Sequence, residues 1–383
     1  MTINNEHKKL NVPNLRFPEF QGEWEESTIG EEFGLYSGNT PSRLNKEHFN
    51  GAINWISSGE LKEHYIADTK EKISDEAAKT LKMLPIGTFV IAIYGLEADG
   101  VRGTGSITKT EATISQACMA FTSKGKVQNE FLYSWYKKHG NVIGIRYAQG
   151  TKQQNLSYDI IEKFKIAYPT FQEQEKLNKF IALLDERIAT QSKIIDKLQS
   201  LIKGIRNEVF GKLRKNIGFN AVVGDVLDYE QPQSYIVENT EYTNEGTPVL
   251  TANKAFVLGY TLETDGIYDK GDCIIFDDFT LDCKYVDFPF KVKSSAIKIL
   301  TAKNKELLRY TFEFLKYLDL STEEHKRHYI AETQNQEFIL PTEQIVKTIA
   351  YIFSTLSLRM ETAVKRRDVF DKQKQYLLRQ MFI

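Results

Sequence analysis

Two long stretches of this sequence repeat one another without a gap, and this repeat limits the possible folds more than any other feature. They cover residues 169–210 and 341–382, and each opens on a Pro-Thr pair and runs without glycine or proline until near its end. A chain of 383 residues with such a repeat is expected to hold two copies of one structural unit. The identical pairs, each 172 residues apart, are Pro169/Pro341, Thr170/Thr342, Gln172/Gln344, Leu184/Leu356, Arg187/Arg359, Thr190/Thr362, Lys193/Lys365, Asp196/Asp368 and Phe210/Phe382.

Both stretches have the spacing of a coiled coil. Seam positions recur in steps of four and three residues, which places them on one face of a helix. Each helix is the other's nearest candidate partner, so we expect an antiparallel coiled coil; two amphipathic helices packed on separate cores are the alternative. The seam positions are Leu177, Ile181, Leu184, Ile188, Gln191, Ile195, Leu198, Ile202, Ile205 and Val209 in the first helix, and Ile349, Phe353, Leu356, Met360, Ala363, Arg367, Phe370, Lys374, Leu377 and Met381 in the second.

The repeat continues between the helices with a shifting offset. Ile29-Gly30-Glu31 matches Val223-Gly224-Asp225, NWISSGE at 54 matches PVLTANK at 248, IGTFVIA at 86 matches KGDCIIF at 270, QACMAF at 116 matches SAIKIL at 295, and EFLYSWYKKHG at 130 matches ELLRYTFEFLKYL at 306. The alternating and apolar runs predict strands and the last pair predicts short helices, so the fold class is α+β. We expect two pseudo-symmetric globular domains at 1–168 and 213–340, each followed by a helical spacer, at 169–212 and 341–383.

The composition is that of a soluble globular protein, with 41% hydrophobic and 26% charged residues. The N-terminus is polar and no stretch approaches the length of a membrane span, so a cytoplasmic protein is expected. Cys118, Cys273 and Cys283 lack a metal-ligand spacing and are expected to be free thiols. The six histidines, including His325 and His328, show no pattern of partners and are expected at the surface.

A chain of two related halves suits a duplex DNA site that is itself divided, with the helical spacers setting the distance between the half-sites. Because the two globular parts differ at most positions, the half-sites should differ in sequence. The formal net charge of −1 opposes this interpretation for a lone DNA binder. Residues 213–340 carry fourteen basic and twenty-one acidic side chains. Partner proteins are therefore expected to supply part of the positive charge that binds DNA.

Six motifs of the chain are similar to those of a known family: SGNTPSR at 37–43, NWISSGE at 54–60, ISQACMAF at 114–121, GTKQQNLS at 150–157, YPTFQEQEKL at 168–177 and LDERI at 184–188. With these motifs the chain resembles, over essentially its whole length, the specificity subunit of bacterial type I restriction-modification systems. The resemblance implies two target-recognition domains that read an asymmetric, bipartite DNA sequence and perform no catalysis. It also implies helices that bind two modification (methyltransferase) subunits and, through them, the restriction (motor nuclease) subunits. No cofactor is expected in this chain, while the partners would use S-adenosylmethionine, ATP and magnesium.

Side chains with paired donors and acceptors on loops are the candidates for DNA contact. The run behind Gly150 is the first choice, and a turn around Pro41 supplies groups for phosphate oxygens; a solvated polar loop and a simple connecting turn are the alternatives. In the second domain the equivalent of residues 150–169 is expected to be shortened to residues 331–341, which would reduce its DNA loop. The candidates are Asn39, Thr40, Ser42, Arg43, Lys152, Gln153, Gln154 and Asn155 in the first domain, and Asn253, Lys254, Lys284, Tyr285, Gln334 and Asn335 in the second.

Patterns of three other functions occur in part or are missing from the sequence. Asp277, Asp278, Asp282 and Lys284 resemble a metal-dependent nuclease site, but the first repeat has no counterpart. The glycines Gly100, Gly103 and Gly105 lack the lysine and helix of a phosphate loop and predict a turn. No Pro-Pro motif of a base-flipping methyltransferase occurs. A protein-interaction scaffold with coiled-coil helices remains the main rival hypothesis.

Overall fold

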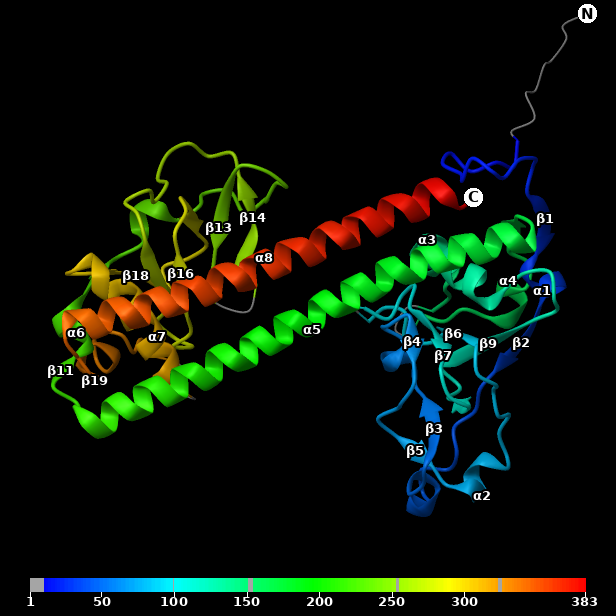
Figure 1. Cartoon of the computed structure of the whole chain (residues 1–383), viewed down its shortest axis with the longest axis horizontal. Helices are drawn as coiled ribbons and strands as arrows, with labels where there is room; N and C mark the ends of the chain where they lie inside the picture. The colour runs from blue at the N-terminus through cyan, green and yellow to red at the C-terminus, as the bar shows by residue number, and fades with distance from the viewer. Residues whose placement is uncertain (1–9, 99, 151–153, 253–254, 323–325) are drawn as a thin grey trace, which may run out of the picture. The chain divides into compact units, whose positions relative to one another are not determined.

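The structure, a computed structural model, describes residues 10–98, 100–150, 154–252, 255–322 and 326–383. The chain divides into two compact units: residues 1–191 with 366–383 form unit 1, and residues 192–365 form unit 2. The two long helices, α5 (Phe171–Asn216) and α8 (Glu343–Met381), each contribute to both units. The predicted α+β fold with two long helices is confirmed (Figure 1). Within the described ranges, no helix is both long and apolar enough to cross a bilayer.

Unit 1 combines three small sheets with the 19-residue helix α3. The largest sheet has the order β2-β9-β6-β7-β4, the second is β5-β3-β8, and β1 pairs antiparallel with β10. The elements are β1 (Glu25–Thr28), α1 (Ile29–Glu32), β2 (Phe33–Ser37), η1 (Lys46–Phe49), β3 (Ile53–Ile56), η2 (Ser58–Glu60), β4 (Tyr65–Ile66), β5 (Lys72–Ile73), α2 (Asp75–Ala78), β6 (Phe89–Ala92), β7 (Gly105–Thr108), β8 (Ala112–Ile114), β9 (Cys118–Ser123), α3 (Asn129–Tyr147), α4 (Tyr158–Ile161) and β10 (Lys165–Tyr168).

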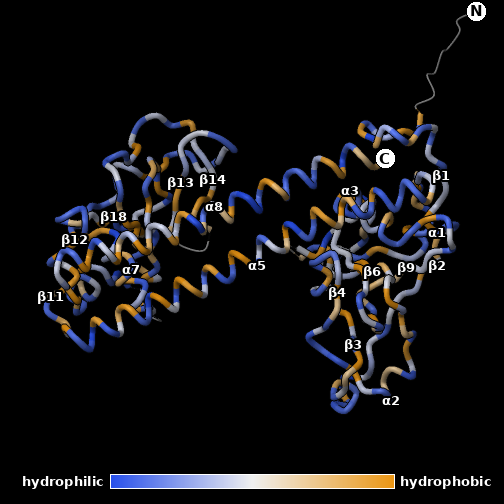
Figure 2. Tube along the Cα trace, in the orientation of Figure 1, coloured by the Kyte–Doolittle hydropathy of each residue, from blue (hydrophilic) through white to orange (hydrophobic). Residues whose placement is uncertain are grey.

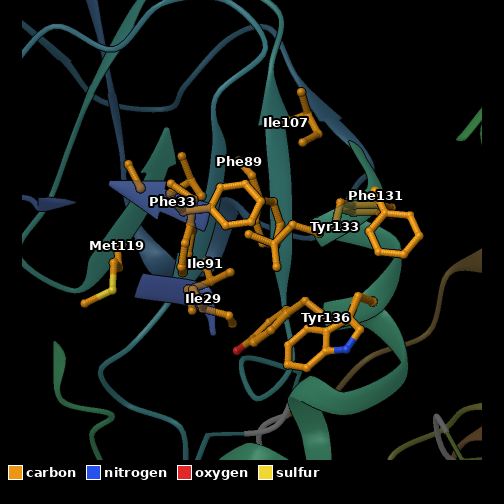
Figure 3. Close-up of a cluster of buried hydrophobic side chains, with 14 of the residues drawn as sticks. Ile29, Phe33, Phe89, Ile91, Ile107, Met119, Phe131, Tyr133 and Tyr136 are labelled. Atoms are coloured by element: carbon orange, nitrogen blue, oxygen red, sulfur yellow. The ribbon is translucent and has the colours of Figure 1, made fainter. Parts of the chain in front are cut away.

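The core of unit 1 lies between the five-stranded sheet and α3 (Figure 3). Phe89 is fully buried at its centre, with its ring 5.5 Å from that of Phe121 and 6.0 Å from that of Tyr133. All four residues of β6 are buried, so this strand has apolar contacts on both faces. The continuous apolar run that predicted a strand here is therefore explained by burial on both sides of the sheet.

Unit 2 repeats the main strands of unit 1 in the same order, with fewer short elements among the described residues. Its sheets are β12-β18-β15-β16, β14-β13-β17 and the antiparallel pair β11-β19. The elements are β11 (Ala221–Val222), α6 (Val223–Val226), β12 (Leu227–Glu230), η3 (Gln233–Tyr235), β13 (Thr247–Leu250), β14 (Val257–Thr261), β15 (Cys273–Asp277), β16 (Cys283–Val286), β17 (Lys291–Val292), β18 (Ile297–Ala302), α7 (Lys305–Leu318), η4 (Thr333–Asn335) and β19 (Glu337–Phe338).

The strand order shows that the two units are copies of one fold. The neighbours β2-β9-β6-β7 in unit 1 correspond to β12-β18-β15-β16 in unit 2, and β3 and β13 each have one antiparallel and one parallel neighbour. The helix α3 follows β9 as α7 follows β18. The short sequence matches between the halves therefore mark equivalent strands, although few residues are identical.

The helices α5 and α8 pair antiparallel within each unit. In unit 1, Lys374 forms an ion pair with Asp185, and the guanidinium of Arg187 lies 5.9 Å from the ring of Phe370. In unit 2, the guanidinium of Arg206 lies 5.8 Å from the ring of Phe353. As residue numbers rise along α5, those of the partners on α8 fall. All twenty predicted seam positions are buried or half-buried, and hydrophobic residues recur along both helices (Figure 2).

Candidate nucleic-acid interface

The loop between β6 and β7 of unit 1 holds two of the three glycines that could have suggested a phosphate site, Gly100 and Gly103. Gly100 and Gly103 adopt φ of +74° and +70°, a conformation that favours glycine. A side chain at Gly103 would also meet the backbone nitrogen of Asn141 at 2.9 Å. Gly100 and Gly103 therefore lie in turns, as predicted, and Gly103 lets the loop approach helix α3 closely. Gly105 is the first residue of strand β7, so the predicted turn is wrong for that glycine.

This loop also holds Gln154, a member of the predicted polar run. The backbone N–H of Leu96 donates to the carbonyl of Gln154 (3.0 Å), and the N–H of Gln154 donates to the Glu97 carboxylate (2.7 Å). Arg102 Nη2 donates to Gln154 Oε1 at 2.9 Å. The Gln154 N–H holds the pKa of Glu97 below its usual value. Gln154 is thus held by hydrogen bonds to its backbone N–H, to its backbone carbonyl and to its side-chain oxygen.

Asn155 is placed by a short β-bridge. It pairs with Tyr94 and with Gln149, and Tyr94 is 37% exposed. Asn155 Oδ1 is buried and has no hydrogen-bond partner among the described residues. The other predicted members of this run, Lys152 and Gln153, lie outside the described residues. Sequence reasoning missed the supporting residues on the β6–β7 loop, because nothing in the sequence links that loop to the segment after Gly150.

The second predicted group, around Pro41, lies beside the β5-β3-β8 sheet. Arg43 makes a bidentate ion pair with Glu71 at 2.7 and 2.8 Å and stacks over the ring of Phe49 at 4.4 Å. The hydrogen bonds to Glu71 raise the pKa of Arg43 further. The Asn39 side chain accepts from the N–H of Thr40, and Ser42 is exposed. Arg43 therefore already has a partner within its own domain, and the turn contacts different elements from Gln154 and Asn155.

In unit 2, the carboxylates that resembled a nuclease site have structural partners. Asp277 Oδ1 accepts from the N–H groups of Phe279 and Thr280 in the β15–β16 turn. Asp282 pairs with Lys316 at 2.6 Å, and these contacts outweigh its burial and lower its pKa. Among the described residues, no group of three or more His, Cys, Asp or Glu side chains is arranged to hold a metal ion.

Lys284 and Tyr285 occupy the edge strand β16 of the same sheet. Lys284 Nζ lies 3.5 Å from Asp282, and the Tyr285 hydroxyl donates to Asp272 at 2.7 Å. The guanidinium of Arg309 lies 4.9 Å from the Tyr285 ring. Two further predicted residues, Asn253 and Lys254, lie outside the described residues.

Asp278 joins the β15–β16 turn to a segment far away in sequence. Its carboxylate accepts from the N–H groups of His328 (3.1 Å) and Tyr329 (2.8 Å), and its carbonyl accepts from the N–H of His328. Lys298 Nζ lies 3.5 Å from this buried carboxylate. His328 is only 1% exposed and His64 only 8%, so the expectation of a surface position is wrong for both residues. His325 lies outside the described residues.

The backbone hydrogen bonds align the two units without a gap in this region. The bond from Leu156 N–H to the carbonyl of Ile93 corresponds to the bond from His328 N–H to the carbonyl of Asp278. Equally, the bond from Ile29 to Phe164 corresponds to the bond from Val223 to Gln336. Leu156 and His328 are 172 residues apart, and so are Phe164 and Gln336. This is the same offset that relates the two long helices.

The expected shortening of the second copy to residues 331–341 is therefore wrong. Residues 322–341 are the counterpart of residues 150–169, and the two segments are equal in length. The second copy is shorter elsewhere: twelve residues (93–104) join β6 to β7, but only five (278–282) join β15 to β16. The sequence alignment missed this because the loop residues differ while the backbone hydrogen bonds stay the same.

Gln334 and Asn335 consequently correspond to Glu162 and Lys163, not to the polar run behind Gly150. They lie in the short 3-10 helix η4, where both amide groups bond to their own turn. Gln334 Nε2 donates to the carbonyl of Ile330 at 2.7 Å, and Asn335 Nδ2 donates to that of Ala331 at 3.3 Å.

Comparisons with known proteins agree with this architecture. Residues 21–200 match the family model described as type I restriction modification DNA specificity domain. The EcoR124I/EcoR124II specificity subunit of Escherichia coli is 45% identical over 126 residues, which are 31% of this chain and 31% of that protein. The MjaIX specificity subunit of Methanocaldococcus jannaschii is 24% identical over 222 residues, 56% of this chain and 50% of that protein. These matched regions span about a third and half of the two curated relatives.

Solved structures show the same fold over nearly the whole chain. The type I restriction-modification S subunit from M. genitalium superposes with a TM-score of 0.68 at 16% identity, covering 97% of this chain and 99% of that one. A chain from a study of assembly and conformational transition in a type I system gives a TM-score of 0.50 at 13% identity, covering 93% and 96%.

The fold and the loops define a class of protein with two similar α+β units, each followed by a long helix and each presenting two joined loops. Residues 21–200 are similar in sequence to the DNA specificity domain of type I restriction-modification systems, and nearly the whole chain has the fold of the solved S subunits.

Proposed function

We propose that the chain is the DNA-specificity subunit of a type I restriction-modification complex and performs no catalysis itself. The observation that carries this proposal is the internal repeat. Two units share one strand order, and each joins its central hairpin loop to a distant polar segment, but the side chains on these loops differ. Such a pair of units suits an asymmetric DNA sequence in two parts, one part for each unit.

In this proposal, residues 1–168 and 213–340 are the target-recognition domains, and residues 169–212 and 341–383 are the helical spacers. The exposed faces of the spacers would bind two modification subunits and, through them, the restriction subunits, in the cytoplasm. S-adenosylmethionine, ATP and magnesium would act in those partners. The acidic balance of residues 213–340 supports a complex in which partners contribute positive charge.

Contacts to bases in the first half-site would come from the segment after Gly150. Gln154 and Asn155 carry amides, which suit adenine in the major groove, and both are held by the β6–β7 loop. Lys152, Gln153, Asn253 and Lys254 stay in the proposal on their sequence positions alone. The turn containing Asn39, Thr40, Ser42 and Arg43 is proposed to contact phosphates.

The test is selection from a random duplex library by the chain purified together with its modification subunit. We expect enrichment of one asymmetric sequence in two parts, with affinity that falls steeply as salt rises. A complex that enriches no sequence would contradict the proposal and favour the protein-interaction scaffold. As a specific check, Asn155→Ala should relax the preference in one half-site only.

A further inference from the structure

Each unit presents an exposed aromatic residue at the same position of its fold. Tyr94 is the second residue after β6, and Phe279 is the second residue after β15; both side chains are 37% exposed. Backbone hydrogen bonds show that the two positions are equivalent. The N–H of Ile93 donates to the carbonyl of Ala117, just before β9, and the N–H of Asp278 donates to the carbonyl of Ala296, just before β18. An exposed aromatic ring is thus kept at this position although the loops differ in length.

The residue beside each ring also corresponds. Tyr94 forms a β-bridge with Asn155, and the guanidinium of Arg327 lies 5.9 Å from the ring of Phe279. Asn155 and Arg327 are 172 residues apart, which is the offset that the hydrogen bonds of Leu156 and His328 establish. The two units therefore carry the pairs Tyr94 with Asn155 and Phe279 with Arg327.

The backbone next to Arg327 is anchored from two sides. Asp278 accepts hydrogen bonds from the N–H groups of the two following residues, His328 and Tyr329. The Glu332 carboxylate contacts both Lys326 Nζ and His328 Nδ1 at 2.9 Å. An arginine on such a fixed backbone loses less freedom on binding than one on a loose loop. Arg327 is itself exposed, in a domain whose overall charge is acidic.

We infer that Arg327, positioned by Phe279, reads a guanine in the second half-site. A guanidinium offers two parallel N–H donors, which match O6 and N7 of guanine in the major groove. The cation–π contact with the Phe279 ring orients the guanidinium without using its N–H donors. Gln334 and Asn335 lie seven and eight residues after Arg327 and bond to their own turn. This inference rests on the proposed function and assigns the residue that determines specificity in unit 2.

The experiment compares recognition sequences selected by the complex with its modification subunit, for the wild type, Arg327→Ala, Arg327→Lys and Phe279→Ala. For Arg327→Ala we expect loss of a guanine preference at one position of one half-site, about tenfold to a hundredfold. Arg327→Lys should lose most of this preference while binding to unrelated DNA stays within about twofold, because the charge is kept but the paired donors are not. Phe279→Ala should weaken the same preference less.

Lys270→Ala is the matched control. Lys270 precedes β15, at the opposite end of the strand from Phe279, and it also lies over an aromatic ring, that of Tyr235 at 5.6 Å. Its removal takes away the same charge from the same unit and should leave the selected sequence unchanged. Uniform weakening on all sequences by Arg327→Ala would show a phosphate contact and overturn the inference, as would an unchanged preference. If the wild-type complex selects no sequence at all, the proposed function itself fails.

Discussion

Nδ1 of His64 lies 2.9 Å from Oδ2 of Asp185, so the segment before β4 is tied to helix α5 by a buried ion pair. Nε2 of the same ring lies 2.8 Å from the Glu130 carboxylate, and the ring is stacked between Tyr65 and Tyr133 at 4.1 and 4.0 Å. Within unit 1, the imidazole therefore joins the globular part to the long helix.

This arrangement predicts a stability that depends on pH. Burial opposes protonation of His64, but the hydrogen bonds and charges of Asp185 and Glu130 outweigh it and raise the pKa of His64. A raised pKa in the folded state stabilises the fold fully below the unfolded value of about 6.5, and this gain is lost as pH rises through the folded pKa. His64→Gln should therefore lower the melting temperature most at pH 5.5 and less at pH 8.5. A difference between wild type and variant that grows with pH would contradict this assignment.

Asp185 offers a second prediction on the same cluster. Burial raises its pKa, but His64 and Lys374 outweigh that effect and lower it overall. Asp185→Asn would leave a buried histidine and lysine without their shared counter-charge. We expect a loss of about 3 kcal/mol in the free energy of unfolding, measured by urea denaturation at pH 6. Lys212→Gln serves as the control, since its pair with Glu208 is exposed and should change stability by less than about 0.5 kcal/mol.

Unit 2 has its own buried ionic contact between helices. Glu313 of α7 is 1% exposed and accepts from Arg206 Nη2 at 2.7 Å and from Arg309 Nη2 at 2.8 Å. Glu313→Gln should cost about 3 kcal/mol, because it leaves two guanidinium groups close together without a charge between them. Hydrogen exchange measured by mass spectrometry should show the loss of protection in β15 and β18. Unchanged exchange in those strands would mean that the contact is unimportant for stability.

The internal repeat predicts that equivalent phenylalanines stabilise different units. Phe210 packs on Tyr310 and Phe314 at 5.3 and 5.4 Å, and its repeat partner Phe382 packs on Phe131 at 5.2 Å. Replacement of either by alanine should cost about 4 kcal/mol. Phe210→Ala should increase hydrogen exchange in β15 and β18, and Phe382→Ala in β6 and β9. Tyr351→Ser, at a position that is 74% exposed, should leave both patterns unchanged.

The sequence predicted those parts of the fold that periodicity records directly. The steps of four and three along residues 177–209 and 349–381 follow from which side chains must be buried, and the apolar run at Phe89 reflects a strand buried on both faces. The exact alignment of strands between the two units was harder to predict from the sequence. The sequence alignment matched Ala92 with Phe276, whereas the pairing to β9 and β18 matches Ala92 with Asp277. Strand register depends on backbone partners that apolar residues of similar size do not distinguish.

The loops could not be aligned from sequence for a related reason. Leu156 and His328 share no chemistry, but both donate an N–H to the residue that follows the equivalent strand. Every residue except proline supplies that donor, so the hydrogen bond leaves no trace in residue identity. Asn155 and Arg327, at equivalent positions of the two loops, differ in both side-chain chemistry and exposure: Asn155 is half-buried and Arg327 is exposed. The counterpart of Asn155 in unit 2 is therefore defined by backbone hydrogen bonds and not by residue identity.

The length of the helices leads to the last prediction. If α5 and α8 set the distance between two half-sites, then seven residues inserted after Gln191 and seven after Lys365 lengthen both helices by about 10 Å and keep the four-three seam in register. About 10 Å corresponds to roughly three base pairs. The selected sequence should keep both half-sites and gain about three unread base pairs between them. Insertion into α5 alone keeps the four-three pattern but shifts the seam residues beyond the insertion past their partners on α8, and it should abolish selective binding. A changed half-site in the double insertion would show that the helices take part in reading bases.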